Sequence, residues 1–280
     1  MSGDAEQPRL EDTGFEPIDR SRFDPEHVAR VAACLDVDPA PVFAAGTLPI
    51  LWHWAFFPPT EPTAGLGPDG HPRRRPEMAP FPRRMFGAGR VRVHTPLRIG
   101  EPAERTSTLA GAALKEGGSG RFWVATVTQT IEQHGVACLE EEKDFLLRAI
   151  GPTPAPGPDE DDAPEAEWVE SLVPDPAFLF RFSAVTYNAH RIHYDRPYAT
   201  GVEGYPNLVV HGPLTAVLLA SMAERRSGRR ARALSFRASA PLFVEQTLWL
   251  TGGPTADGVS MAAVRSDHAV AMTMDLELSD

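Results

Sequence analysis

The sequence predicts an α+β protein of two similar units, in each of which an antiparallel sheet wraps around one helix. Each half of the chain carries one apolar helical segment, at 48–57 and at 214–222, ahead of a run of strand-like segments. A faint repeat also links the halves, because the Arg, Pro and Leu of 92–97 recur at one constant offset in 237–242. An internal repeat of this kind indicates two units side by side.

Strand-like segments follow both helical segments in the same order. They are 106–109, 122–131 and 136–139 in the first half and 247–250, 259–265 and 269–278 in the second. The first segment of each half alternates in polarity, which is typical of a half-buried strand. The other two in each half flank a short turn, His134-Gly135 or Asp267-His268, which is a hairpin signature.

Two proline-rich stretches divide the chain further. Residues 151–167 are rich in proline and then in acidic residues and have no apolar periodicity, so we expect an exposed linker between units 1–150 and 168–280. Residues 58–82 indicate a long loop within the first unit, which is either a functional lid or disordered.

Composition excludes several classes of protein. The formal net charge of -11 argues against broad binding to a nucleic-acid backbone. No apolar run approaches the ~18–20 residues of a membrane helix, and the polar N-terminus is unlike a secretory signal. Cys34 and Cys138 are too few for a disulfide framework or a zinc site. We therefore expect a cytoplasmic protein with no nucleic-acid or membrane partner.

A cluster of histidines marks the candidate site. His190, His193 and His211 lie within 22 residues, with Asn188 and Asp195 beside them. Histidine is the side chain best suited to proton transfer near neutral pH. Two other interpretations stay open: His190 and His193 could bind a metal ion together with His211 or Asp195, or the polar groups could simply satisfy one another in a buried loop.

Gly212 and Pro213 precede an apolar run and predict the start of a helix. Free backbone N–H groups and the positive end of the helix dipole suit such a start to binding an oxyanion. A proton-transferring group beside an oxyanion site is what chemistry next to a carbonyl requires. The chain has no dinucleotide-binding or phosphate-loop motif, so we expect no redox cofactor.

Arginines cluster just beyond this run, at Arg225, Arg226, Arg229, Arg230 and Arg232. They are either a solvated helix end or a phosphate dock for a nucleotide-bearing carrier or a carrier-protein prosthetic arm.

The segments Asn188-Ala189-His190-Arg191-Ile192-His193 and His211-Gly212-Pro213-Leu214 resemble the MaoC-like hydratases and dehydratases of the hot-dog superfamily. More narrowly, the chain is similar to the double hot-dog branch that includes mesaconyl- and itaconyl-CoA hydratases and type 2 hydroxyacyl-thioester dehydratases. The hydratase motif of that family runs Asp-x-Asn-Pro-(Leu or Ile)-His. Its His falls on His193 and its Asp on Asn188, so the resemblance departs from the motif at the Asp.

The resemblance implies a role for each matched residue. His193 would be the main acid/base, and the N–H of Gly212 would hold the thioester oxygen. Asn188 would position water or substrate, because an amide does not exchange a proton at neutral pH. His190 would be a second acid/base or a hydrogen-bonding orienter. Asp195 is the nearest carboxylate, unless it only pairs with Arg191 or Arg196.

The reaction implied is reversible hydration of a 2-enoyl thioester, with the first unit covering the acyl group at one active site per chain. The thioester would be carried on CoA or on the phosphopantetheine of an acyl carrier protein, with Arg191, Arg225 and Arg226 as candidate carrier contacts. No metal or other cofactor is implied, and we expect a homo-oligomer, most simply a homodimer. Alternatives that keep the fold are amine addition, thioester hydrolysis, or binding of acyl thioesters without turnover.

Overall fold

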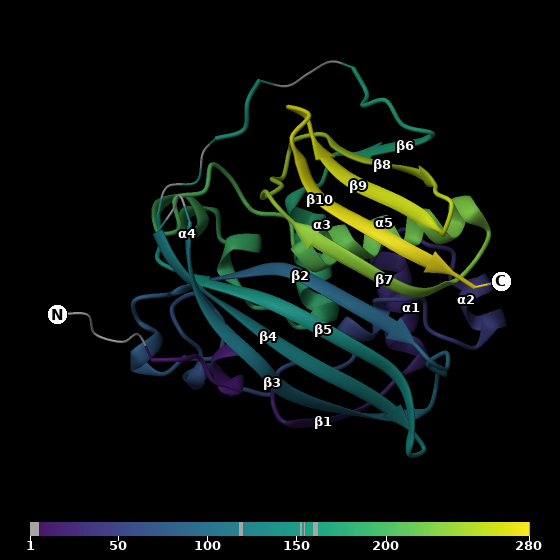
Figure 1. Cartoon of the computed structure of the whole chain (residues 1–280), viewed down its shortest axis with the longest axis horizontal. Helices are drawn as coiled ribbons and strands as arrows, with labels where there is room; N and C mark the ends of the chain where they lie inside the picture. Colours follow the sequence, from purple (N-terminus) through teal and green to yellow (C-terminus); the bar gives the residue numbers. More distant parts are fainter. Residues whose placement is uncertain (1–5, 118–119, 152, 154, 159–161, 280) are drawn as a thin grey trace.

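The computed structural model describes residues 6–117, 120–151, 153, 155–158 and 162–279. Within these residues ten strands form one antiparallel sheet in the order β1-β3-β4-β5-β2-β7-β10-β9-β8-β6 (Figure 1). The strands are β1 (Ile18–Arg22), β2 (Arg83–Val93), β3 (Pro102–Gly117), β4 (Gly120–Gln133), β5 (Val136–Arg148), β6 (Trp168–Leu172), β7 (Ala231–Ala238), β8 (Leu248–Pro254), β9 (Val259–Arg265) and β10 (Val270–Leu278).

The two halves of the sheet share one topology. Strands β1–β5 follow the order β1-β3-β4-β5-β2, and β6–β10 follow the matching order β6-β8-β9-β10-β7. The halves join through the antiparallel pairing of β2 with β7, from Ala88 opposite Arg237 to Arg92 opposite Ala233. The boundaries 1–150, 151–167 and 168–280 stay a prediction, since residues 152, 154 and 159–161 of the expected linker lie outside the described residues.

The helices are short apart from one. They are α1 (Pro25–Cys34), α2 (Pro39–Ala45), α3 (Pro176–Thr186), α4 (Arg196–Gly201) and α5 (Gly212–Ser227), with 3-10 turns η1 (Leu10–Thr13), η2 (Trp52–Ala55), η3 (Thr63–Gly65), η4 (Pro76–Met78) and η5 (Arg191–His193). In Figure 1, α3 and α5 lie behind the sheet. No helix in the described part of the chain has both the length and the apolar character needed to cross a membrane.

Helix α5 confirms the helical segment predicted at 214–222. It begins at Gly212-Pro213 and ends at Gly228, whose φ of 70° is the left-handed conformation that glycine adopts most readily. Leu214, Leu219 and Met222 have no exposed surface, because α5 packs against β7–β10 on one side and other core residues on the rest. A helix enclosed on all sides is apolar all round.

The helix expected at 48–57 is wrong. Only the 3-10 turn η2 forms there. Leu51 has a φ of 70°, which is incompatible with a right-handed α-helix through this residue. Two prolines at 58 and 59 prevent the helix from continuing beyond the segment. Among the described residues, no long helix therefore packs on the inner face of β2–β5, whereas α5 packs against β7–β10.

Candidate active site

A cavity of about 870 Å³ lies between the two halves. Strands β2 and β5 contribute Arg84, Phe86, Lys143 and Phe145, and the loop before β2 contributes His71. The second half contributes side chains of the histidine-rich segment, namely Asn188, His190 and His193, together with Gly212 and Thr215 at the start of α5. The cavity thus joins the predicted catalytic segment to the part of the first half that has no long helix.

His193 is held as a base in the wall of this cavity. Its Nδ1 lies 2.7 Å from the carbonyl oxygen of Val209, which can only accept a hydrogen bond. The proton of the neutral ring is therefore on Nδ1, and Nε2 keeps a lone pair. Burial lowers the pKa of His193 from 6.5 to about 4, although the bond to Val209 opposes the shift. At neutral pH the ring is uncharged and able to accept a proton.

His193 belongs to a row of four imidazoles. The ring centroids of His71 and His190 are 4.3 Å apart, those of His190 and His193 are 5.4 Å apart, and His193 stacks on His211 at 3.6 Å. Burial lowers the pKa of His71, His190 and His211 well below the usual value. His211 is completely buried and its Nε2 is 2.8 Å from the hydroxyl of Ser183. It supports the His193 ring from behind rather than facing substrate.

The metal-binding interpretation gains no support from this arrangement. The stacked rings of His193 and His211 do not converge on a common point. Within the described ranges, no group of three or more His, Cys, Asp or Glu side chains is placed to hold a metal ion.

Asn188 lies in the cavity wall just after α3, which ends at Thr186 and is capped by Tyr187 with a φ of 53°. Its Oδ1 accepts a hydrogen bond of 2.9 Å from the backbone N–H of His190. The carbonyl side of the amide is therefore engaged, and its NH₂ group remains to donate to a water molecule or a substrate oxygen. This placement fits the positioning role expected of Asn188.

Gly212 occupies a position that admits no side chain. A Cβ atom there would lie 2.7 Å from Cδ1 of Phe86, on strand β2 of the first half. Phe86 is itself stacked on Phe236 with centroids 4.9 Å apart, so it has little freedom to move away. The first-turn N–H groups of α5 have no partner within the helix. The start of α5 and His193 line the same cavity. The hydrogen bond from His193 to Val209, three residues before Gly212, holds the ring next to the start of the helix.

Asp195 and Arg191 lie outside the cavity lining. Their side chains form an ion pair at 2.6 Å, which was the alternative reading of Asp195. Asp195 also caps α4 by accepting the N–H of Tyr198 at 3.1 Å, and Arg191 donates to the carbonyl of Pro68 at 2.9 Å. Both residues therefore fix the fold of the motif, because their charged groups are already engaged.

Arg225 and Arg226 are placed far from the reaction centre. Both pair with Glu170 on β6. They lie at the C-terminal end of α5, ~20 Å from Gly212 at the helical rise of about 1.5 Å per residue. Like Arg191, they do not line the cavity, so the structure brings none of the three predicted carrier contacts to it.

The loop 58–82 supplies a residue that the sequence did not indicate. The backbone N–H of Arg191 donates to the carbonyl of Asp69 at 2.9 Å. Gly70, with a φ of 89°, packs so closely on the carbonyl of Ala189 that a Cβ would overlap it. These contacts place His71 beside His190. No local motif could have revealed that the loop carries a fourth imidazole into the site.

A buried polar network borders the cavity within the first half. Glu141 accepts hydrogen bonds from Trp54 Nε1 at 2.7 Å and from His53, and it pairs with Lys143 at 2.9 Å. Burial alone would raise the pKa of Glu141, but Lys143 and His53 bring it down to about 2. Burial lowers the pKa of Lys143 to about 8, against the opposing pull of Glu141. The carboxylate of Glu141 is therefore ionised, and it neutralises the charge of the Lys143 ammonium.

Comparison with known proteins assigns the family. The model of the family described as hydroxyacyl-thioester dehydratase type 2 matches residues 51–244. The mesaconyl-C(4)-CoA hydratase of Chloroflexus aurantiacus is 46% identical over 254 residues, which cover 89% of this chain and 90% of that protein. The chain belongs to the hydroxyacyl-thioester dehydratase type 2 family. The resemblance drawn from the histidine motif and the helix start is confirmed.

Solved structures of low sequence identity share the fold of this dehydratase-family chain. HtdX of Mycobacterium tuberculosis is 18% identical with a TM-score of 0.67, covering 94% of this chain and 99% of that one. A second protein of that organism, described as having a double hot-dog fold, gives a TM-score of 0.56 at 14% identity, covering 97% and 98%. The predicted double hot-dog architecture is confirmed.

Proposed function

We propose that the chain catalyses the reversible addition of water across the double bond of a 2-enoyl thioester. Membership of the dehydratase family supports a hydro-lyase reaction. The observation that carries the mechanism is the tautomer of His193. Its Nδ1 proton is committed to Val209, so Nε2 presents a lone pair to the same cavity that the start of α5 borders.

In the hydration direction, Nε2 of His193 takes a proton from a water molecule. At the same time the oxygen of that water bonds to the β-carbon of the substrate. The C=C electron pair moves toward the thioester oxygen, and the N–H of Gly212 stabilises the resulting enolate-like charge. The imidazolium then returns its proton to the α-carbon, so His193 ends neutral. The developing negative charge stabilises the imidazolium transiently, which offsets the low pKa of the buried ring.

A carboxylate is not required in this scheme, because a single imidazole accepts and returns the same proton. Asn188 donates an amide N–H to the water oxygen and leaves proton transfer to His193. His190 and His71 are neutral, so either ring can donate an N–H to the β-oxygen or relay a proton. This accounts for an amide at the motif position where the family has Asp.

The finer assignments follow from the relatives and remain proposals. The mesaconyl-C(4)-CoA hydratase at 46% identity points to a CoA thioester of a short acyl group that keeps a second, free carboxylate. We favour CoA over an acyl carrier protein, and we retain a cytoplasmic location and a homodimer as expectations.

The test is incubation with mesaconyl-C4-CoA, crotonyl-CoA and their 3-hydroxyacyl counterparts, read by mass spectrometry. A mass gain of one water supports hydration. Release of free CoA would indicate thioester hydrolysis instead, and binding without any product would indicate a non-catalytic module. His193→Ala is expected to slow hydration by about 10²–10⁴-fold, the usual worth of a general acid/base. His134→Ala, which changes an exposed histidine, is the matched control. Hydration by His193→Ala at the wild-type rate would remove the mechanism.

A further inference from the structure

Most of the buried or partly buried cations around the cavity are matched by carboxylates. The matched pairs are Arg74 with Asp69, Arg83 with Glu203, Arg105 with Asp19 and Lys143 with Glu141. Arg84 and Arg148 both line the cavity, and neither has a carboxylate partner among the described residues. Of the two, Arg84 is the one whose charge acts on the row of histidines. An enclosed cation without a counter-ion is costly, and buried charges in proteins are normally paired.

Protein contacts hold Arg84 in place without neutralising it. Its Nη1 donates to the backbone carbonyl of Thr13, and the guanidinium lies 5.0 Å from the centroid of the Phe145 ring. Burial lowers the pKa of Arg84 to about 10, and the positive charge of Arg74 contributes. The side chain is nevertheless charged at neutral pH. Asp69, the acidic group whose charge acts on Arg84, already pairs with Arg74 at 3.3 Å.

The position of Arg84 relates it to the reaction centre. It precedes by two residues Phe86, the ring that closes on Gly212, so both project from the same face of β2. Its charge acts on His190, which lies beside His193, and on His71, which lies beside His190. A group bound by Arg84 would therefore sit close to the carbon that takes up water.

We infer that Arg84 is the specificity-determining residue of the site and binds a free carboxylate on the acyl group of the substrate. A planar guanidinium with donors left over matches a carboxylate in a way that an ammonium does not. The substrate carboxylate would then be the counter-ion of Arg84. This assignment rests on the proposed function, because it takes the acyl group to occupy the cavity.

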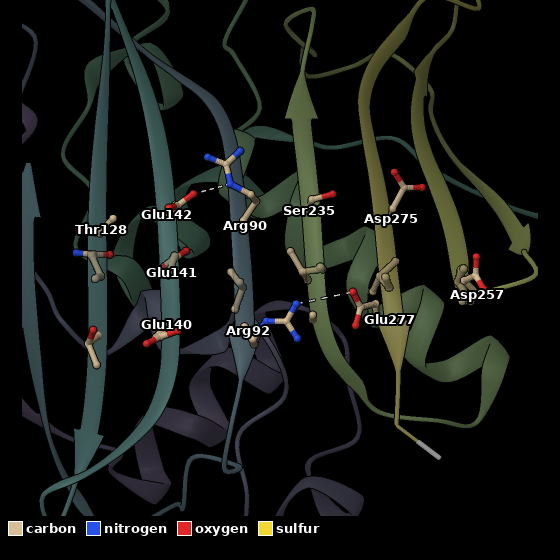
Figure 2. A pocket seen from close by; sticks show the side chains of 18 of the residues that line it. Arg90, Arg92, Thr128, Glu140, Glu141, Glu142, Ser235, Asp257, Asp275 and Glu277 are labelled. Carbon is tan, nitrogen blue, oxygen red and sulfur yellow. Dashed lines mark hydrogen bonds and ion pairs between the residues drawn. The ribbon is translucent and has the colours of Figure 1, made fainter. Parts of the chain in front are cut away.

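The outer face of the same strand provides a contrast. There, Arg90 and Arg92 line an open groove together with Glu140, Glu142 and Glu277 (Figure 2). Arg90 pairs with Glu142 at 2.6 Å, and Arg92 lies 3.9 Å from Glu277. These arginines are exposed and compensated. Arg90 is therefore a matched control for the removal of one positive charge from β2.

The test compares Arg84→Met, Arg84→Lys and Arg90→Met on two thioesters, mesaconyl-C4-CoA and 3-methylcrotonyl-CoA, which differ in a carboxylate replaced by a methyl group. Wild type is expected to prefer the carboxylated substrate. Arg84→Met should lower kcat/KM for mesaconyl-C4-CoA by about 10²-fold or more, as expected for truncating one partner of a buried charge pair. For 3-methylcrotonyl-CoA it should change kcat/KM only a few-fold. Arg84→Lys should fall between Arg84→Met and wild type, and Arg90→Met should match wild type.

Equal losses on both thioesters would show that Arg84 only supports the fold and would overturn the inference, as would a wild-type enzyme without preference for the carboxylate. Calorimetric binding of the same two thioesters gives a readout independent of turnover. Carboxylate-dependent binding that Arg84→Met abolishes, without hydration of any enoyl-CoA, would uphold Arg84 and reject the proposed reaction. Hydration of both thioesters without a preference for the carboxylate would uphold the proposed reaction and reject the role of Arg84.

Discussion

The protonation of His193 links the site to the stability of the whole chain. In the unfolded chain the imidazole has its ordinary pKa of 6.5, whereas burial lowers it to about 4 in the folded protein. Between these two values the unfolded chain binds more protons than the folded one. The free energy of unfolding therefore rises with pH across this window, and the contribution of His193 is lost as pH falls from 6.5 toward 4. The shift corresponds to roughly 3 kcal/mol.

Urea denaturation of wild type and His193→Gln at a series of pH values measures this contribution. Glutamine can still donate to the Val209 carbonyl but does not titrate, so the variant lacks the acid penalty of the buried ring. We expect the stability difference between the two proteins to move by ~3 kcal/mol in favour of the variant between pH about 7.5 and 4. His134→Gln, which replaces an exposed histidine outside the buried row, is the control for loss of an imidazole. A difference between wild type and His193→Gln that is constant with pH would refute a buried neutral imidazole.

Two further predictions concern the residues beside His193. Gly212→Ala keeps the backbone N–H, but its Cβ would displace the start of α5 from Phe86, so turnover should fall by about 10²–10³-fold, as when an oxyanion donor is lost. It should also lower the melting temperature, because its Cβ would lie 2.7 Å from Phe86; Gly201→Ala, where nothing lies within 4 Å, is the control, and normal activity of Gly212→Ala would contradict the oxyanion role. Asn188→Asp preserves the acceptor for the His190 N–H and adds a negative charge. It should retain hydration and shift the acid limb of the kcat/KM profile to higher pH, since the carboxylate raises the pKa of His193; an unshifted limb would place residue 188 too far from that ring.

Local sequence was sufficient where the structure is determined locally. The apolar run after Gly212-Pro213 carries its own start signal and its own terminating glycine, and α5 follows both. The ion pair of Asp195 with Arg191 is also local, because four residues separate them and Asp195 caps the helix that follows. The histidine motif itself comes from one continuous stretch of chain, so its members could be named before their geometry was known.

The segment 48–57 shows where local reasoning fails. Its apolar composition favours a helix, but His53 and Trp54 both bind Glu141, which lies far along the chain on β5. The segment that makes those bonds begins at Leu51 with a positive φ, which a right-handed α-helix does not accommodate. His71 was missed for a similar reason, because its place in the site depends on the docking of Gly70 against Ala189. Both features are products of tertiary contacts that leave no periodic signal.

The missing helix explains how the two halves divide the work. Both have the same strand order, so each half has one inner face that a helix could cover. In the second half α5 fills that face, and its N-terminus can then serve catalysis. In the first half only the turn η2 forms at 48–57, and Lys143 and Arg84 line the cavity there. A helix of ordinary length at 48–57 would bury these charges under apolar side chains. On the proposed function, its absence lets the second half supply the acid–base groups and leaves Arg84 of the first half open to the acyl group.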